Sequence, residues 1–412
     1  MAIAQKTEAR SWPCVFSALT VGGSDSLGAD IRLDVSPKTT VLVGRNGAGK
    51  SALLEDISLC AQYATTFAVV GSSPRRFGCE LHQIDDPSFK IQYDCSWDSP
   101  AQEADGNASI EQTSPDDVPT ASIRERCRVF HGDDESLAWE VKDGWLCRSS
   151  GTREELSEGR GLLHPRLGDL RKGVPVLGDF PLSEMLRRYA VPRICAGVPR
   201  AGSQREAVLL PHPWRLRFSQ QYRSVPRGIR VLSSQITDWY HETPDLFHEL
   251  EAISQRLKLL AQIKVTVFDN PAHTADPRSP PQLTHVSVDG TNLGLLSDGT
   301  LRVLEILAAL IAPKVSLLLI EEPEMAVHPG LLERLLHEVD AYTTDRQVIL
   351  STQSPQVVSW ARPESMRLVT RTNAQTQVRS LNEAERVQID RYLHDEGTLG
   401  DYIYSSSNDD NG

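Results

Sequence analysis

The chain has 412 residues, of which 40% are hydrophobic and 24% are charged, the ordinary composition of a globular protein with a sizeable core. No apolar run approaches the roughly 20 residues of a membrane-spanning helix, and Met1 to Arg10 lack the apolar core of a signal peptide. The net charge of −12 argues against a dedicated, high-affinity DNA-binding protein.

The N-terminal part is predicted to begin with a hairpin of short strands, Val15 to Val21 and Ile31 to Val35. The Gly-rich loop 22–28 between them either approaches a nucleotide base or ribose, or is a plain hairpin turn. Thr40 to Val43 is predicted to be a buried strand. The cysteines show no CxxC pair and no metal-ligand spacing, so we expect reduced thiols in a cytoplasmic protein.

A phosphate-binding loop of the pattern GxxxxGKS follows that strand and precedes a helix expected from Ser51 to Tyr63. Its residues are Gly44, Arg45, Asn46, Gly47, Ala48, Gly49, Lys50 and Ser51. The glycines let successive backbone N–H groups face phosphates, and the helix N-terminus adds its positive dipole end. We expect Lys50 to bind the β- and γ-phosphates of ATP, and Ser51 to bind Mg²⁺.

The middle of the chain is predicted to contain strands followed by helices. Strands are expected at 89–93, 126–130, 137–141, 145–148, 265–268 and 285–288, with helices at 236–240 and 246–260. Residues 150–230 are rich in Pro, Gly and Arg, and we expect short helices and loops there. The catalytic fold is therefore predicted to be split into 1–95 and 285–400. The region 96–284 is then an insertion, and 401–412 a frayed tail.

Two stretches of the insertion are strongly charged. Residues 98–120 contain acids and no Lys or Arg, which is typical of a solvated loop. Residues 181–232 contain ten arginines against two glutamates. These arginines could contact nucleic-acid phosphates while Trp214, Phe218 and Tyr222 stack on bases. The alternative is that they pair with the acidic loop.

A second motif, Leu296, Ser297, Asp298, Gly299 and Thr300, precedes a helix expected from Leu301 to Ala312. By itself it is a plain N-cap and turn. Together with the phosphate loop it looks like an ABC signature, in which the Ser297 hydroxyl and the helix N-terminus form an anion site. We expect this site to close on the γ-phosphate held by a second copy, in a head-to-tail dimer.

A third motif is a pair of carboxylates at the end of an apolar strand, Leu317 to Ile320. Such an unbroken apolar run indicates a central parallel strand, whose carboxyl end faces the ligand in open α/β sheets. Glu321 stands where an acid usually binds Mg²⁺. Glu322 is the candidate general base for the attacking water. Pro323 then ends the strand.

These motifs, with Glu321-Glu322-Pro323-Glu324 and His328-Pro329, resemble the ABC-type ATPase heads of the SMC, RecF and OLD group. The tract is more closely similar to bacterial RecF-like AAA-family predicted ATPases. The resemblance implies an α/β P-loop NTPase with ABC-ATPase head architecture. It comprises a mixed central sheet, an antiparallel β subdomain and an inserted helical region. It also implies an ATP-driven dimer, with Val327 and His328 in the D-loop position.

One residue departs from this pattern. The family usually has a histidine where Gln353 follows the strand that ends at Thr352. A glutamine can donate a hydrogen bond to the γ-phosphate but cannot become cationic, so we expect slow turnover. For the Q-loop glutamine, which senses Mg²⁺ in this family, Gln83 and Gln92 are both candidates.

The sequence therefore predicts a cytoplasmic ATPase that dimerises on ATP and regulates a partner effector, such as a nuclease or toxin, or acts on nucleic acid. The resemblance suggests a role in phage defence, and no contact with a membrane is expected. The first alternative is an ATP-locked scaffold that hydrolyses slowly or not at all. The second is the ATPase subunit of a transporter, against which the signature, Gln353 and the long insertion argue.

Overall fold

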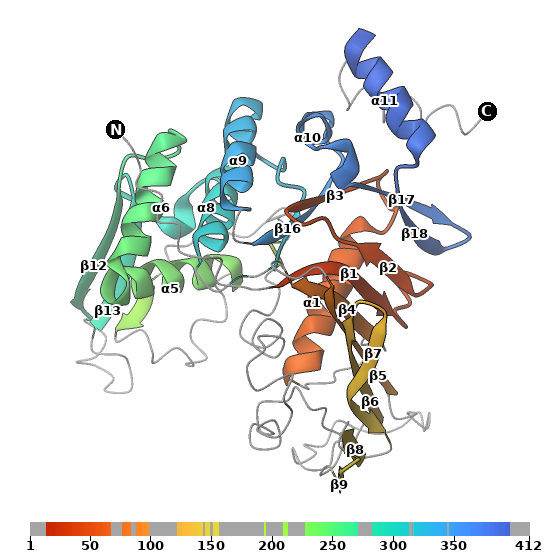
Figure 1. Cartoon of the computed structure of the whole chain (residues 1–412). Coiled ribbons are helices and arrows are strands. Elements are labelled where there is room, and N and C mark those ends of the chain that lie inside the picture. Colours follow the sequence, from red (N-terminus) through yellow and green to blue (C-terminus); the bar gives the residue numbers. More distant parts are fainter. Residues whose placement is uncertain are drawn as a thin grey trace, which may run out of the picture. The chain divides into compact units, whose positions relative to one another are not determined.

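Two compact units make up the chain in the computed structural model, most of whose elements are labelled in Figure 1. Unit 1 contains Met1–Arg193, Lys314–Leu319 and Thr343–Gly412, and unit 2 contains Ile194–Pro313 and Ile320–Tyr342. The structure describes residues 14–66, 76–83, 88–98, 122–142, 145–148, 151–155, 193–194, 209–212, 227–270, 282–312, 315, 317–343 and 346–395. Within these ranges, no helix is long and apolar enough to cross a membrane.

Unit 1 contains an antiparallel sheet of eight strands in the order β2-β1-β4-β5-β6-β7-β8-β9. The strands are β1 (Cys14–Gly22), β2 (Ile31–Asp34), β4 (Arg76–Gln83), β5 (Phe89–Asp98), β6 (Ser122–His131), β7 (Asp134–Lys142), β8 (Trp145–Arg148) and β9 (Arg153–Glu155). β6 pairs with β5 over its whole length, so one sheet continues past the domain boundary expected at residue 95. The split core, 1–95 with 285–400, stays a prediction.

A second sheet of six strands has the order β10-β15-β16-β3-β17-β18. Its strands are β10 (Arg193–Ile194), β15 (Leu317–Glu321), β16 (Gln347–Thr352), β3 (Thr39–Val43), β17 (Met366–Thr372) and β18 (Gln375–Ser380). β3 pairs in parallel with both β16 and β17, and β18 runs antiparallel to β17. Every residue of β3, β15 and β16 is buried, as expected for strands covered on both faces.

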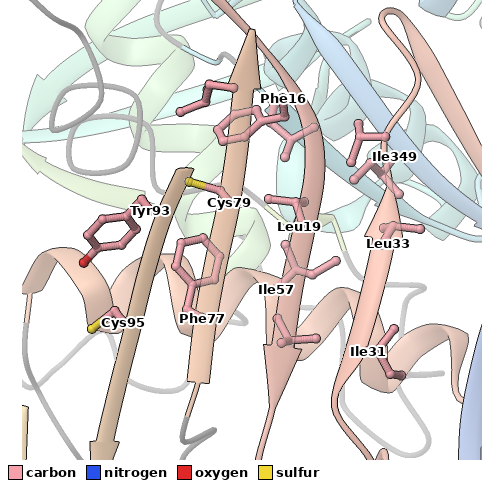
Figure 2. Packing of buried hydrophobic residues seen from close by; sticks show 14 of the residues in the cluster. Phe16, Leu19, Ile31, Leu33, Ile57, Phe77, Cys79, Tyr93, Cys95 and Ile349 are labelled. Carbon is pink, nitrogen blue, oxygen red and sulfur yellow. The ribbon is translucent and has the colours of Figure 1, made fainter. Parts of the chain in front are cut away.

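The hydrophobic core of unit 1 lies where α1 (Lys50–Thr66) packs against β1 and β4. Alternate residues of each strand point to this face, because side chains in a strand alternate between its two sides. Figure 2 shows Phe16, Leu19, Phe77, Cys79, Tyr93 and Cys95 from β1, β4 and β5 together with Ile57 of α1. All seven are at most 2% exposed, and each large apolar side chain buried in this way contributes roughly 1.5–3 kcal/mol.

Among the described residues of unit 1, three further helical segments follow the β16 strand. They are α10 (Pro355–Trp360), η4 (Pro363–Ser365) and α11 (Glu383–Asp395). Arg379 of β18 donates two hydrogen bonds to Glu385 of α11, both of 2.8 Å. This pair connects the β17–β18 hairpin to the last described helix.

Unit 2 is built from helices and a small sheet. Its helices are α5 (Arg227–Glu242), α6 (Pro244–Arg256), η3 (Leu293–Leu295), α8 (Asp298–Ile311) and α9 (Pro329–Tyr342). Its strands are β11 (Leu209–His212), β12 (Ile263–Asp269), β13 (Gln282–Val288) and β14 (Thr291–Asn292). α6 contacts α5 and α8, and α8 contacts α9. Arg256 of α6 and Glu338 of α9 form an ion pair of 2.6 Å that joins these two helices.

Most predicted elements are confirmed. β1 pairs antiparallel with β2, β7 pairs antiparallel with β8, and helices follow the phosphate loop and the signature motif. The described part of 150–230 differs from the expectation of short helices and loops. It contains strands β9, β10 and β11, and α5 already begins at Arg227. β11 forms because it pairs with β13, a partner distant in the sequence that local composition cannot reveal.

Several predicted segments lie outside the described residues. They are nearly all of the acidic loop 98–120, most of the arginine-rich stretch 181–232 with Trp214, Phe218 and Tyr222, and the tail 401–412. Of the seven cysteines, Cys79, Cys95, Cys127 and Cys147 are described as free thiols. Burial raises the pKa of the Cys79 and Cys127 thiols well above their ordinary value, as expected for cysteines that serve as packing residues.

Candidate nucleotide-binding site

The phosphate loop lies in unit 1, between the end of β3 at Val43 and the start of α1 at Lys50. It therefore leads directly into the positive end of a helix dipole. Gly47 and Gly49 have φ angles of +78° and +102°, which residues with a side chain rarely adopt. Ala48 N–H donates to the carbonyl of Arg45 at 3.2 Å and fixes the curl of the loop.

Lys50 places its ammonium group over this loop. Its side chain is buried, with 5% of the residue exposed, and Nζ donates to the carbonyls of Gly44 at 2.6 Å and Arg45 at 3.1 Å. A buried ammonium group is stable only where oxygen atoms accept its hydrogen bonds. The phosphate loop thus holds one cation at a fixed position beside a curled backbone, an arrangement that suits the oxygens of a triphosphate.

The hairpin of β17 and β18 packs directly against the loop. A Cβ atom on Gly44 would lie 2.2 Å from the carbonyl oxygen of Val369, and one on Gly49 would lie 2.3 Å from Oγ1 of Thr376. Neither distance is compatible with a side chain, so this hairpin requires glycine at both positions. Val369 and Thr376 are not among the residues predicted from the sequence. The signal in the sequence was Asn373, a residue type that favours tight hairpin turns, and Asn373 and Ala374 both have positive φ, as in type I′ hairpins.

The Gly-rich loop 22–28 packs on the same hairpin. Thr376 N–H donates to the carbonyl of Leu27 at 2.8 Å, and Arg371 Nη1 donates to the carbonyl of Ser26 at 3.0 Å. A Cβ atom on Gly28 would lie 2.5 Å from the carbonyl oxygen of Ala374. Of the two predicted roles for this loop, these contacts favour a turn that supports the hairpin.

Gln353 follows β16, the strand next to β3 in the parallel part of the sheet. Thr352 is paired in register with Val43, so Gln353 and Gly44 leave neighbouring strands at the same edge. Thr352 Oγ1 accepts a hydrogen bond of 2.9 Å from the N–H of Ser354, which turns the chain immediately after the strand. Side chains at the carboxyl ends of adjacent parallel strands are well placed to share one ligand.

The carboxylate segment, Glu321 to Val327, lies in unit 2. Glu321 is 6% exposed and ends β15, and Glu322 follows with φ at +46°. Two turns then form, because Met325 N–H donates to the carbonyl of Glu322 at 3.0 Å and Val327 N–H to that of Glu324 at 3.2 Å. Arg302 of α8 donates to the carbonyls of Glu321 and Glu322. The sequence alone assigned no role to Arg302.

The signature motif forms the N-terminus of α8, also in unit 2. Ser297 is the N-cap, and its Oγ accepts from the N–H of Thr300 at 3.2 Å. A Cβ atom on Gly299 would lie 2.1 Å from the carbonyl oxygen of Ala326, so the start of α8 is packed against the carboxylate segment. His328, in the predicted D-loop, accepts from the N–H of Gly330 at 3.2 Å and thereby supports the first turn of α9.

The remaining candidates are placed as follows. Gln92 lies in β5, in register between Glu80 of β4 and Arg128 of β6, and Gln83 is the last residue of β4. The choice between them as Q-loop residue stays a prediction. Among the described residues, no group of three or more His, Cys, Asp or Glu side chains could hold a metal ion by itself. The assignment of Ser51 and Glu321 to Mg²⁺ stays a prediction.

Comparison with known proteins gives one family match. Residues 218–359 match the model described as "AAA domain, putative AbiEii toxin, Type IV TA system". No curated protein matches the chain.

Solved structures of SMC head domains are also similar. One SMC head bound to the C-terminal winged-helix domain of ScpA has a TM-score of 0.42 and 12% identity, with 90% of this chain and 99% of that chain covered. The SMC head domain from Thermotoga maritima has a TM-score of 0.38 and 14% identity, with 89% of this chain and 99% of that chain covered. The Pyrococcus furiosus SMC head bound to the C-terminal domain of ScpA has a TM-score of 0.38 and 15% identity, with 92% of this chain and 100% of that chain covered.

A phosphate loop between a parallel strand and a helix, a capped helix at the signature motif and a carboxylate-ended strand together form an ABC-type P-loop NTPase fold. Residues 218–359, about a third of the chain, match the AAA domain of the AbiEii-type family.

Proposed function

We propose that the protein binds ATP with Mg²⁺ and hydrolyses it between two head-to-tail copies. The observation that carries the proposal is the phosphate loop. Gly44 and Gly49 leave no room for a side chain, and the buried Lys50 begins the following helix. Backbone N–H groups, an ammonium group and a helix N-terminus together supply the positive potential that a triphosphate requires. The family match supports the same activity.

Each proposed site residue has a distinct task. Lys50 binds β- and γ-phosphate oxygens, and Ser51 and Glu321 bind Mg²⁺, which neutralises phosphate charge when bound. The oxygen of the attacking water bonds to the γ-phosphorus while Glu322 accepts a proton from that water. The bond from that phosphorus to the bridging oxygen breaks, which releases ADP and phosphate. Gln353 donates an amide hydrogen bond to the γ-phosphate.

A second copy completes the site in this proposal. Ser297 and the N-terminus of α8 contact the γ-phosphate held by the other copy. Leu295 and Met325 support such an interface because both are apolar and exposed, at 40% and 36%, directly beside the signature motif and within the carboxylate segment. An apolar contact of this kind becomes stable when a partner surface covers it.

In the cell, we propose a cytoplasmic ATP-gated dimer that regulates an effector such as a nuclease or toxin in phage defence. The description of the matching family, which names a toxin of a toxin–antitoxin system, supports a role with an effector.

Action on nucleic acid through the arginine-rich stretch is the second part of this proposal. A salt-sensitive gel shift in the presence of ATP tests it, and no shift at low salt would exclude it.

Glu322→Gln tests hydrolysis. The amide keeps the shape of the side chain but cannot accept the proton, so we expect turnover to fall by about 100-fold or more. ATP remains bound, and a nucleotide-bound dimer accumulates that light scattering after gel filtration detects. Glu333→Gln, at an exposed position on α9, is the matched control and should behave as wild type. Wild-type turnover in Glu322→Gln would contradict the role of Glu322 as the base, whereas no measurable turnover in the wild type would favour the non-hydrolysing scaffold.

Gln353→His tests the hypothesis that Gln353 keeps turnover slow. A histidine can carry a positive charge toward the γ-phosphate, whereas glutamine cannot. We expect the histidine variant to hydrolyse ATP faster than the wild type at saturating ATP, with similar ATP affinity. An unchanged rate would show that Gln353 does not limit turnover.

A further inference from the structure

Arg302 has a buried guanidinium group that donates hydrogen bonds to backbone carbonyls. It lies in the second turn of α8 and is 4% exposed. Its Nη2 donates to the carbonyl of Glu321 and, at 3.4 Å, to that of Glu322. Removing a guanidinium group from water is costly unless oxygen atoms accept its hydrogen bonds. These two carbonyls accept such bonds at the point where the strand β15 ends.

The backbone that Arg302 contacts has an unfavourable conformation. Glu322 has φ at +46°, which costs a residue with a side chain about 1–2 kcal/mol. Pro323 follows it and restricts its backbone further. Such conformations persist only where surrounding contacts hold them. The carbonyl of Glu322 is held twice, by Arg302 and by the N–H of Met325 at 3.0 Å.

The same helix touches the carboxylate segment at a second point. Gly299, one turn before Arg302, lies against the carbonyl oxygen of Ala326, where an added Cβ would be 2.1 Å away. Ala326 also has a positive φ, at +60°. One helix thus fixes both ends of the segment that carries the Glu322 side chain, and this helix begins at the exposed N-cap Ser297.

We propose that Arg302 is a positioning residue for the reaction. It holds the carbonyls of Glu321 and Glu322 so that the Glu322 carboxylate is directed toward the attacking water. Through α8 it also makes this direction depend on how Ser297 is engaged by the second copy. The inference rests on the proposed function, because it assigns Arg302 a role in directing the proposed base.

Arg302→Ala tests the proposal through kinetics. We expect kcat to fall about 10- to 100-fold, because a misplaced catalytic group costs this much even when the substitution is remote. The Kd for ATP, measured by equilibrium titration, should stay within about twofold, since Arg302 lies outside the phosphate loop. Millimolar guanidinium should restore part of kcat by occupying the space of the lost side chain. Arg302→Lys, which keeps the positive charge but not the planar, forked guanidinium group, should have an intermediate kcat.

The matched control is Arg334→Ala. Arg334 also donates to a backbone carbonyl, that of Gly330 at 3.0 Å, but on the exposed face of α9. This variant should keep wild-type kcat and Kd. Wild-type kcat in Arg302→Ala would overturn the proposal, as would a joint loss of kcat and ATP affinity without guanidinium rescue. If Arg302→Ala does not fold, Arg302→Lys decides: a lower kcat at unchanged Kd supports the proposal, and wild-type kcat overturns it.

Hydrogen exchange separates this inference from the proposed function. In nucleotide-free protein, amides of residues 321–328 should exchange faster in Arg302→Ala, or in Arg302→Lys, than in Arg334→Ala. Equal exchange would overturn the positioning role whatever the activity. Conversely, a wild-type protein without ATPase activity would refute the proposed function, while the exchange result would still report on Arg302.

Discussion

At Gly299, the signature helix and the carboxylate segment meet backbone to backbone. The sequence Ser-Asp-Gly-Thr by itself requires only an N-cap and a helical first turn, for which alanine would serve as well as glycine. The contact with the carbonyl of Ala326 supplies the reason for glycine, because only a hydrogen atom fits in this space. At this position, one missing side chain allows two motifs to pack as a unit.

The variant Gly299→Ala should therefore be damaging despite the higher helix propensity of alanine. Its Cβ would lie 2.1 Å from the Ala326 oxygen, so the carboxylate segment must shift. We expect the free energy of unfolding in urea to fall by about 1–3 kcal/mol, the usual cost of overpacking, and ATP turnover to fall by about 10-fold or more. In Gly330→Ala the nearest atom is 3.7 Å away, and stability should be unchanged or higher. Equal stability of the two variants would contradict this account.

At the scale of elements, charged side chains stabilise the eight-stranded sheet on the side away from its core. Glu80 of β4 accepts from Arg32 of β2 at 2.7 and 3.1 Å and pairs with Lys90 of β5 at 2.9 Å. The Arg32 hydrogen bonds, aided by those of Lys90, lower the pKa of Glu80 from 4.5 to about 2. One carboxylate thereby links three strands.

Glu80→Gln should destabilise the protein in a pH-dependent manner. The pKa of Glu80 is lower in the folded state, so its charge stabilises the fold above pH 4.5, and this stabilisation is lost as pH falls toward 2. The shift corresponds to at most about 3 kcal/mol, and screening at the half-exposed Arg32 reduces this to about 1–2 kcal/mol. In urea unfolding, the difference in free energy of unfolding between the wild type and Glu80→Gln should be smaller at pH 3 than at pH 7. Glu140→Gln, which removes the exposed pair with Arg126, should cost less than about 0.5 kcal/mol.

The sequence was sufficient for the elements that carry local signals. β3, α1 and β16 were predictable because apolar runs, helical spacing and the glycine pattern all lie within a few residues. The pairing of β6 with β5 could not be predicted, because the two strands are separated by a segment without periodicity. In the same way, nothing near Glu322 in the sequence signals a positive φ, and nothing near Arg302 identifies the carbonyls to which it donates.

At the scale of the whole molecule, the motif set is divided between the two compact units. The phosphate loop and Gln353 belong to unit 1, whereas the signature motif and the carboxylate segment belong to unit 2. If the signature acts on the nucleotide of the other copy, defects in the phosphate loop and in the signature should complement each other. This follows because each active site of such a dimer draws residues from both chains.

Mixing two inactive variants tests this division. Lys50→Ala removes phosphate binding, and Ser297→Arg blocks the signature, so each variant alone should be inactive. In an equal mixture that exchanges freely, half of the dimers are mixed, and each mixed dimer has one intact site of two. Turnover should therefore recover to about a quarter of the wild-type rate. No recovery, with mixed dimers demonstrated by differential tagging, would show that both residues serve a site in the same copy.

The β17–β18 hairpin has a consequence for the order of events during protein synthesis. The glycines of the phosphate loop, at positions 44 and 49, are packed by residues 369 and 376. Similarly, the amide of Gln347 bonds to the backbone of Phe16, at 2.7 and 2.8 Å. The ribosome therefore produces the loop long before the residues that give it its final packing. A nascent chain that lacks the hairpin should be unable to form the finished loop, which delays nucleotide capture until nearly all of the described chain has emerged.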